Sequence, residues 1–96
     1  MCGIFALFGY KKASSEHEFR VFVKAGADKI MHRGPDYSGV VTFGGKENAL
    51  AHERLSIVGT SSGSQPLSST HSDCYLTVNG EIYNYLTLRS ILEKEH

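Results

Sequence analysis

The sequence is poor in cysteine and carries no net charge, and both features exclude classes of protein. It has two cysteines, Cys2 and Cys74, too few for the disulfide framework of a small secreted domain. Ten basic residues balance ten acidic ones, and no lysine or arginine run offers a surface for nucleic-acid phosphates. No apolar run approaches the roughly 20 residues that a membrane span requires. We therefore expect a reduced, cytoplasmic protein that binds neither nucleic acid nor membrane.

Metal-ligand spacing and internal repeats are also missing. His17, His32 and His71 show no spacing with the cysteines that is typical of a zinc site, so we predict no metal. The composition, 41% hydrophobic and 21% charged, is that of an ordinary globular protein. A chain of this length buries one core, which predicts a single domain over residues 1–96.

The apolar pattern predicts an α+β domain. Short apolar runs predict five strands, at residues 4–8, 40–43, 49–58, 75–78 and 81–83. Apolar residues at helical spacing predict two helices, at residues 16–31 and 86–95.

Local signals refine this pattern. Ser15 and Glu18 match a capping box at the start of the first helix. Asn79 and Gly80 predict a tight hairpin turn between the last two strands. We expect Leu88, Ile91 and Leu92 to form the buried side of the last helix. The resulting order of strands and helices predicts antiparallel strands with helices packed outside them.

Cys2 is the residue with the strongest chemical potential. If Met1 is removed, its thiol and its free α-amine share one Cα, which joins a nucleophile to its own base. A lone cysteine near a terminus has no role in most proteins, so further evidence is needed. Three segments supply it: RGPD at residues 33–36, HERLSIVG at 52–59 and NGEIYN at 79–84.

These segments follow CGI at residues 2–4 in a familiar order and spacing. The chain therefore resembles the N-terminal glutaminase domain of asparagine synthetases, a class II glutamine amidotransferase of the N-terminal-nucleophile hydrolase fold. The resemblance covers residues 2 to about 92, and the HERLSI run favours asparagine synthetases within the class. It implies a four-layer αββα sandwich of two antiparallel sheets, of which this chain supplies a part.

The resemblance also implies the chemistry of the site. Cys2 would attack the carboxamide of glutamine, with Asn79 and Gly80 as donors to the oxyanion. The residue types suit this role, because a side-chain amide and a neighbouring backbone N–H can point at one oxygen. A plain turn remains the alternative for Asn79 and Gly80.

The head group of glutamine would be bound by a second set of residues. Arg54 would hold the α-carboxylate through two parallel hydrogen bonds. Backbone groups near Leu55 and Ile57, and the Glu81 carboxylate, would surround the amino acid. Surface positions are the alternatives for Arg54 and Glu81. A further family aspartate that contacts the α-ammonium has no counterpart in these 96 residues.

Three functions follow as hypotheses. The first is a glutaminase that supplies ammonia to a synthetase domain, in cis or in trans, for asparagine synthesis from aspartate. No cofactor is expected here; ATP and Mg would belong to that synthetase domain, and an oligomer is compatible with the family. The second is a truncated or diverged module that binds without turnover. The third is a class II amidotransferase with another ammonia acceptor.

Overall fold

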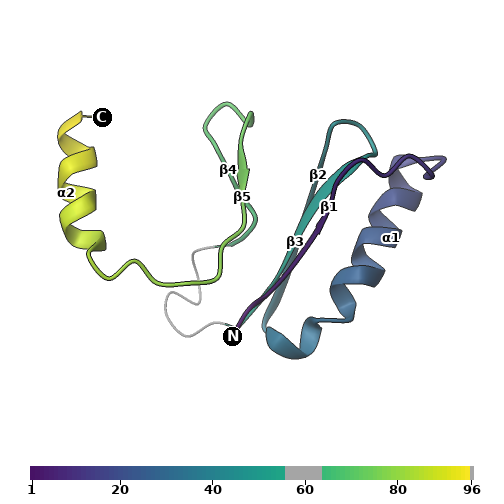
Figure 1. Ribbon diagram of the computed structural model, residues 1–96, viewed down its shortest axis with the longest axis horizontal. Helices are drawn as coiled ribbons and strands as arrows, with labels where there is room; N and C mark the ends of the chain where they lie inside the picture. The colour runs from purple at the N-terminus through teal and green to yellow at the C-terminus, as the bar shows by residue number, and fades with distance from the viewer. Residues whose placement is uncertain (56–63, 96) are drawn as a thin grey trace.

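The computed structural model describes residues 1–55 and 64–95, in which two sheets and two helices confirm the α+β class. The first sheet contains β1 (Gly3–Leu7), β2 (Tyr37–Phe43) and β3 (Asn48–Arg54). β3 lies in the middle and pairs antiparallel with both neighbours (Figure 1). The predicted strand 49–58 corresponds to β3, but its residues beyond 55 lie outside the described part.

Helix α1 (Glu16–Asp28) begins where the capping signal predicts. The Ser15 hydroxyl accepts a hydrogen bond of 3.1 Å from the Glu18 N–H. The reciprocal bond differs from the prediction, because the Glu18 carboxylate accepts from the Ser14 N–H instead of the Ser15 N–H. Glu18 therefore fastens the segment before the helix as well as the helix itself.

The predicted end of this helix at residue 31 is wrong. The Lys29 and Ile30 N–H groups bond to the carbonyls of Gly26 and Ala27, three residues earlier. This tighter spacing ends the α-helix at Asp28, and a short 3-10 helix, η1 (Met31–Arg33), follows. The chain thus turns into the RGPD segment earlier than helical periodicity alone indicates.

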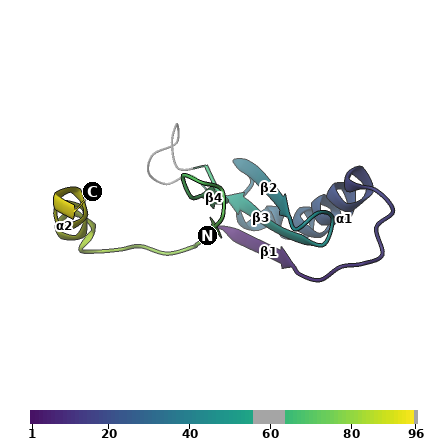
Figure 2. The same ribbon diagram turned by 90° about the horizontal axis from the view of Figure 1, so that it is seen from above.

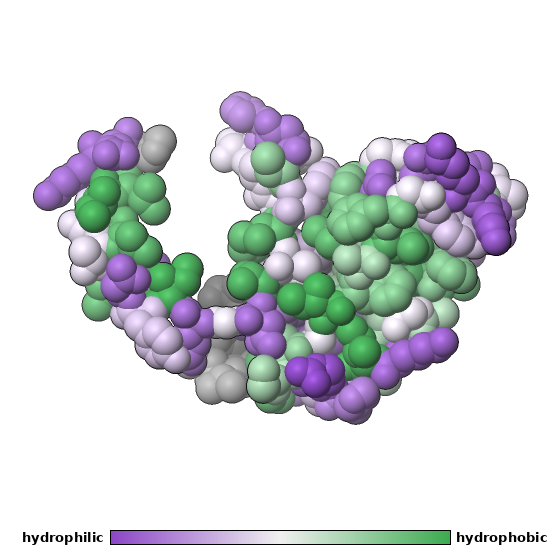
Figure 3. All heavy atoms as spheres, in the orientation of Figure 1, coloured by the Kyte–Doolittle hydropathy of each residue, from purple (hydrophilic) through white to green (hydrophobic). Residues whose placement is uncertain are grey.

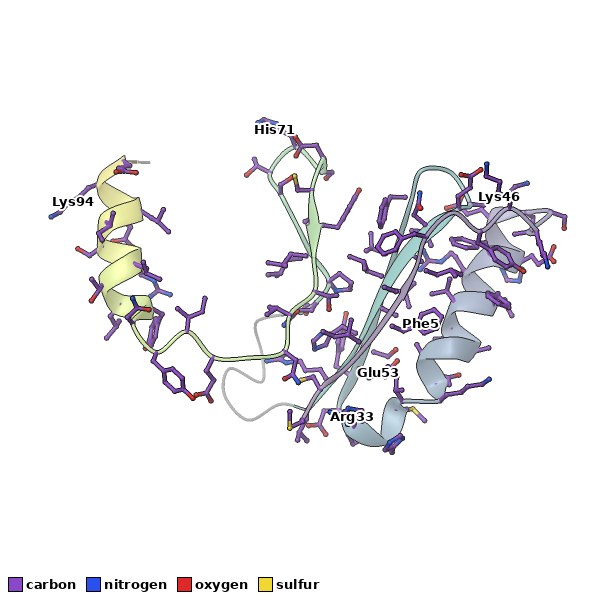
Figure 4. The ribbon with its side chains drawn as sticks, viewed as in Figure 1. Phe5, Arg33, Lys46, Glu53, His71 and Lys94 are labelled. Carbon is purple, nitrogen blue, oxygen red and sulfur yellow. The ribbon has the colours of Figure 1, made fainter. Side chains whose placement is uncertain are left out.

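The core lies between α1 and one face of the first sheet. Phe19, Val23 and Ala27 of the helix are fully buried against Ala49 and Ala51 of β3. Burial of each large apolar side chain contributes roughly 1.5–3 kcal/mol, so this face fixes β3 under the helix. Figure 4 shows the labelled Phe5 side chain between the sheet and α1.

The predicted hairpin over residues 75–83 is wrong. Residues 81–83 form no strand; instead β5 (Tyr75–Leu76) pairs with β4 (Leu67–Ser68) in a second sheet. Asn79 and Gly80 do not have the positive φ that a type I′ turn needs at both positions. The connection between β4 and β5 is instead closed by Ser69, whose hydroxyl accepts from the N–H groups of Asp73 and Cys74.

The second sheet lies against the face of the first sheet that is opposite α1. His52, which alternates with the helix-facing Ala51, contacts Thr77 there. The rings of Phe43 and Tyr75 stack with centroids 5.0 Å apart. Helix α1, the first sheet and the second sheet therefore form three successive layers, which Figure 2 shows from above.

Helix α2 (Tyr85–Glu95) agrees with its predicted bounds to within one residue, but not with its predicted burial. It stands apart from both sheets (Figure 1). Leu88, Ile91 and Leu92 are 40%, 50% and 54% exposed. Apolar side chains consequently appear on the surface of α2 in Figure 3. Neither helix among the described residues is long and apolar enough to cross a membrane.

Candidate active site

Cys2 is half-buried and lies directly before β1, beside the end of β3. Its sulfur accepts a hydrogen bond from the Leu55 N–H at 3.4 Å. The Leu55 carbonyl lies 3.8 Å from the same sulfur and accepts from the thiol. Leu55 follows the last residue of β3, so the pairing of two strands places the thiol on backbone groups 53 residues away in sequence.

Arg54 is the neighbour of Cys2 across the sheet. Gly3 pairs with Glu53, so Cys2 lies one step further along, opposite Arg54. Opposite residues of antiparallel strands project from the same face of a sheet. Asp36 donates its N–H to the Arg54 carbonyl at 3.0 Å and holds this end of β3. The structure thus brings together three predicted site residues: Cys2, Arg54 and Leu55.

The other predicted site residues do not join this group. Asn79, Gly80 and Glu81 are exposed, and within the described residues none of them forms a hydrogen bond with Cys2. The chain after β5 passes near the N-terminus in both ribbon views (Figures 1 and 2). Ile57, the remaining predicted residue, lies outside the described residues.

Arg33 contacts Cys2, and the sequence does not predict this contact. Its Nε–H donates a hydrogen bond of 3.3 Å to the Cys2 carbonyl. Figure 4 shows Arg33 at the end of η1, where the first strand begins. The RGPD motif is one of the segments that carry the family resemblance, and the resemblance does not predict an arginine that fixes the backbone of Cys2.

The buried Glu53 carboxylate lies near the end of β3, on the face of the first sheet that α1 covers. Glu53 is 1% exposed and accepts a hydrogen bond of 2.7 Å from the Ser38 hydroxyl. Lys24 donates to the Ser38 oxygen at 2.9 Å and lies 3.7 Å from the Glu53 carboxylate. Its hydrogen bond to Asp28, aided by the Glu53 charge, raises the pKa of Lys24. The buried charge is thereby both bonded and paired, as burial of a carboxylate requires.

His52 lies on the opposite face and is fully buried. Its Nδ1 is 2.7 Å from the Thr77 hydroxyl, and its Nε2 has no hydrogen-bond partner among residues 1–55 and 64–95. Burial lowers the pKa of His52, the Arg54 charge lowers it further, and the Glu53 charge opposes both. Among the described residues, no three His, Cys, Asp or Glu side chains gather so as to hold a metal ion.

A family model and individual curated proteins both match this chain, and they indicate the same kind of protein. The glutamine amidotransferase domain family matches residues 1–96. The asparagine synthetase [glutamine-hydrolyzing] 1 of Saccharomyces cerevisiae is 43% identical over 89 residues, 93% of this chain. The nodule asparagine synthetase of Pisum sativum is 44% identical over 92 residues, 96% of the chain. The chain spans 15% of the length of each of these two curated relatives.

Proposed function

The chain belongs to the glutamine amidotransferase domain family, and on that premise we propose that it hydrolyses glutamine with Cys2 as its nucleophile. The observation that carries the proposal is the position in which hydrogen bonds hold Cys2. Cys2 is held between the Leu55 backbone and the Arg33 side chain, opposite an arginine suited to bind a carboxylate.

The reaction begins after Met1 is removed. The Met1 side chain is 72% exposed and precedes β1, so this end of the chain is open to an aminopeptidase. The freed α-amine of Cys2 takes the thiol proton, and the sulfur attacks the carboxamide carbon of glutamine. The carbon–nitrogen bond breaks, the proton leaves with ammonia, and a thioester remains. Water then opens the thioester, which releases glutamate and restores the thiol.

Binding and charge stabilisation complete the proposed mechanism. Arg54 would hold the α-carboxylate, with the backbone near Leu55 and Ile57 around the amino acid and Glu81 at the α-ammonium. Asn79 and Gly80 would donate to the oxyanion, where one donor is worth roughly 2.7–4 kcal/mol of barrier. Their exposed segment has to approach Cys2 for this role.

The layer order supports a wider architectural proposal. Helix α1, the first sheet and the second sheet are three layers in the order α, β, β. We propose that α2, whose apolar residues are exposed, supplies part of a fourth layer in an αββα sandwich.

The names of the relatives suggest the fate of the ammonia. Both names describe a glutamine-hydrolyzing asparagine synthetase, and the Pisum sativum protein is named as the nodule form. We propose that a synthetase domain, in cis or in trans, accepts the ammonia to make asparagine in the cytoplasm. ATP and Mg would act in that domain.

The test compares two cysteine variants. Ammonia release from glutamine is measured for the Met1-processed protein, for Cys2→Ala and for Cys74→Ala, which alters the exposed cysteine in the turn before β5. Loss of activity in Cys2→Ala alone supports the proposal. Equal rates in all three proteins would remove it.

A binding module without turnover is the second candidate, favoured by the exposed positions of Asn79 and Gly80. The intact mass of the purified protein separates the two. A retained Met1 blocks the α-amine and supports the binding module, whereas a processed Cys2 that reacts rapidly with an electrophile supports the glutaminase.

A further inference from the structure

One row of residues crosses the first sheet on the face opposite α1. The register pairs Ile4 of β1 with His52 of β3, and His52 with Gly39 of β2. This row lies two residues from Cys2 along β1 and two residues from Arg54 along β3. Each two-residue step along a strand spans about 6.6 Å. The row therefore lies on the same face of the sheet as the candidate site, one such step along the strands from Cys2 and Arg54.

The second layer is fastened to the first at this row. Thr77 bonds to His52 Nδ1 at 2.7 Å. A Cβ on Gly39 would lie 1.9 Å from the Gln65 carbonyl oxygen, so the two backbones touch there. The Gln65 side chain in turn accepts a hydrogen bond of 2.8 Å from the Val78 N–H. Residues 65, 77 and 78 therefore form one strap across the row.

The strap continues directly into the segment with the proposed oxyanion donors. Asn79 is two residues beyond Thr77, as Cys2 is two residues beyond the row on β1. Both ribbon views show that the chain after β5 runs past the N-terminus (Figures 1 and 2). Thr77, bonded to His52, and Val78, bonded to Gln65, are thus the last residues held by hydrogen bonds to the sheet region before Asn79 and Gly80.

We propose that His52 and Thr77 are positioning residues, whose hydrogen bond sets the place of the Asn79-Gly80 segment relative to Cys2 and Arg54. The inference rests on the proposed function. It also accounts for a polar side chain in an apolar position. Within the described part of the chain the buried imidazole has one nitrogen without a partner, which costs stability, and a positioning role explains why a histidine stands there.

The first experiment separates the hydroxyl from the shape of residue 77. Thr77→Val keeps the volume and removes the hydrogen bond, whereas Thr77→Ser keeps the hydroxyl. Loose placement of a reacting group by about 1 Å costs up to about 100-fold in rate, so we expect Thr77→Val to lower kcat about 10- to 100-fold. The KM for glutamine should rise less than kcat falls, because Arg54 belongs to β3 and, of the proposed head-group residues, Glu81 alone lies in the segment that Thr77 positions. Thr77→Ser should retain kcat.

A double variant that also changes His52 separates an effect on kcat from an effect on stability. His52→Phe, combined with Thr77→Val, replaces the bonded pair by an apolar pair of similar shape. Removal of both partners of a buried hydrogen bond is nearly neutral for stability. We expect the double variant to melt within a few degrees of the wild-type protein and to show the same fall in kcat as Thr77→Val alone.

The outcomes distinguish this inference from the proposed function. If the wild-type protein releases ammonia and Thr77→Val keeps its kcat within twofold, the positioning role is overturned while the glutaminase stands. The same follows if Thr77→Ser loses as much as Thr77→Val. If the wild-type protein releases no ammonia from glutamine, the glutaminase fails and the positioning role fails with it.

Discussion

Gly34 lies so close to Glu53 that a Cβ on Gly34 would meet the Glu53 carbonyl oxygen at 2.1 Å. The obstacle is steric, since the φ of −155° at Gly34 is open to any residue. This contact seats the RGPD segment on the end of β3. Arg33 reaches the Cys2 carbonyl from that seat, so the absence of a side chain at residue 34 helps to hold the proposed nucleophile.

The first prediction concerns Gly34→Ala. Insertion of a methyl group against fixed backbone should lower the free energy of unfolding by about 1–3 kcal/mol. Gly80→Ala is the matched control, because no atom of the described residues lies within 4 Å of a Cβ at residue 80 and its φ is not positive. Urea denaturation followed by circular dichroism measures both. Equal stability of the two variants would contradict the account of the RGPD corner.

The second prediction concerns the hydrogen bond from Ser38 to the buried Glu53 carboxylate. Ser38→Ala removes the 2.7 Å bond and leaves a buried acceptor whose remaining charged partner, among the residues that the structure describes, is Lys24 at 3.7 Å. We expect a loss of about 1–3 kcal/mol in the free energy of unfolding. Ser68→Ala on the exposed strand β4 is the control and should be neutral. A neutral Ser38→Ala would show that Lys24 alone stabilises the carboxylate.

Local signals predict the start of α1 and the strands of the first sheet. The start of α1 depends on Ser15 and Glu18, which are three residues apart, and such a signal is visible in sequence. Strands β1 and β3 follow from short apolar runs. The α+β class could therefore be predicted without knowledge of any long-range contact.

A competing local pairing and long-range contacts account for what sequence analysis does not predict. Asn-Gly favours a hairpin after β5, but β5 pairs with β4 on its N-terminal side, across the turn at residues 69–74, so that signal is overridden. The periodicity of α2 predicts which apolar residues share one face of the helix. It cannot predict whether another element covers that face. Arg33 and His52 contact residues 31 and 25 positions away, and no local pattern reports such contacts.

The third prediction concerns the pH dependence of stability. Burial holds the pKa of His52 below its ordinary value of 6.5. As the pH falls past about 6.5 the unfolded chain takes up a proton at this residue and the folded chain does not. The contribution of His52 is present in full above that pH. Below it, we expect the free energy of unfolding to fall by up to about 1.4 kcal/mol per pH unit until the folded imidazole also titrates.

Removal of the imidazole isolates this effect. His52→Phe should show a flatter dependence of unfolding free energy on pH between about 5 and 6.5 than the wild-type protein. His71→Gln, which alters an exposed histidine in the turn between β4 and β5, should keep the wild-type slope. Urea midpoints measured across this pH range give both slopes. A wild-type slope in His52→Phe would assign the effect to other groups.

The fourth prediction tests Arg54 as the anchor for the α-carboxylate of glutamine. Lysine keeps the charge but loses the planar fork that binds a carboxylate through two bonds. One charged hydrogen bond contributes about 1.5–3 kcal/mol, so Arg54→Lys should raise the KM for glutamine about 10- to 100-fold. Alkylation of Cys2 by a small neutral reagent should stay near the wild-type rate, because the thiol is held by the Leu55 backbone. Arg20→Lys on the exposed side of α1 is the control, and a KM equal in the two variants would remove Arg54 from the binding site.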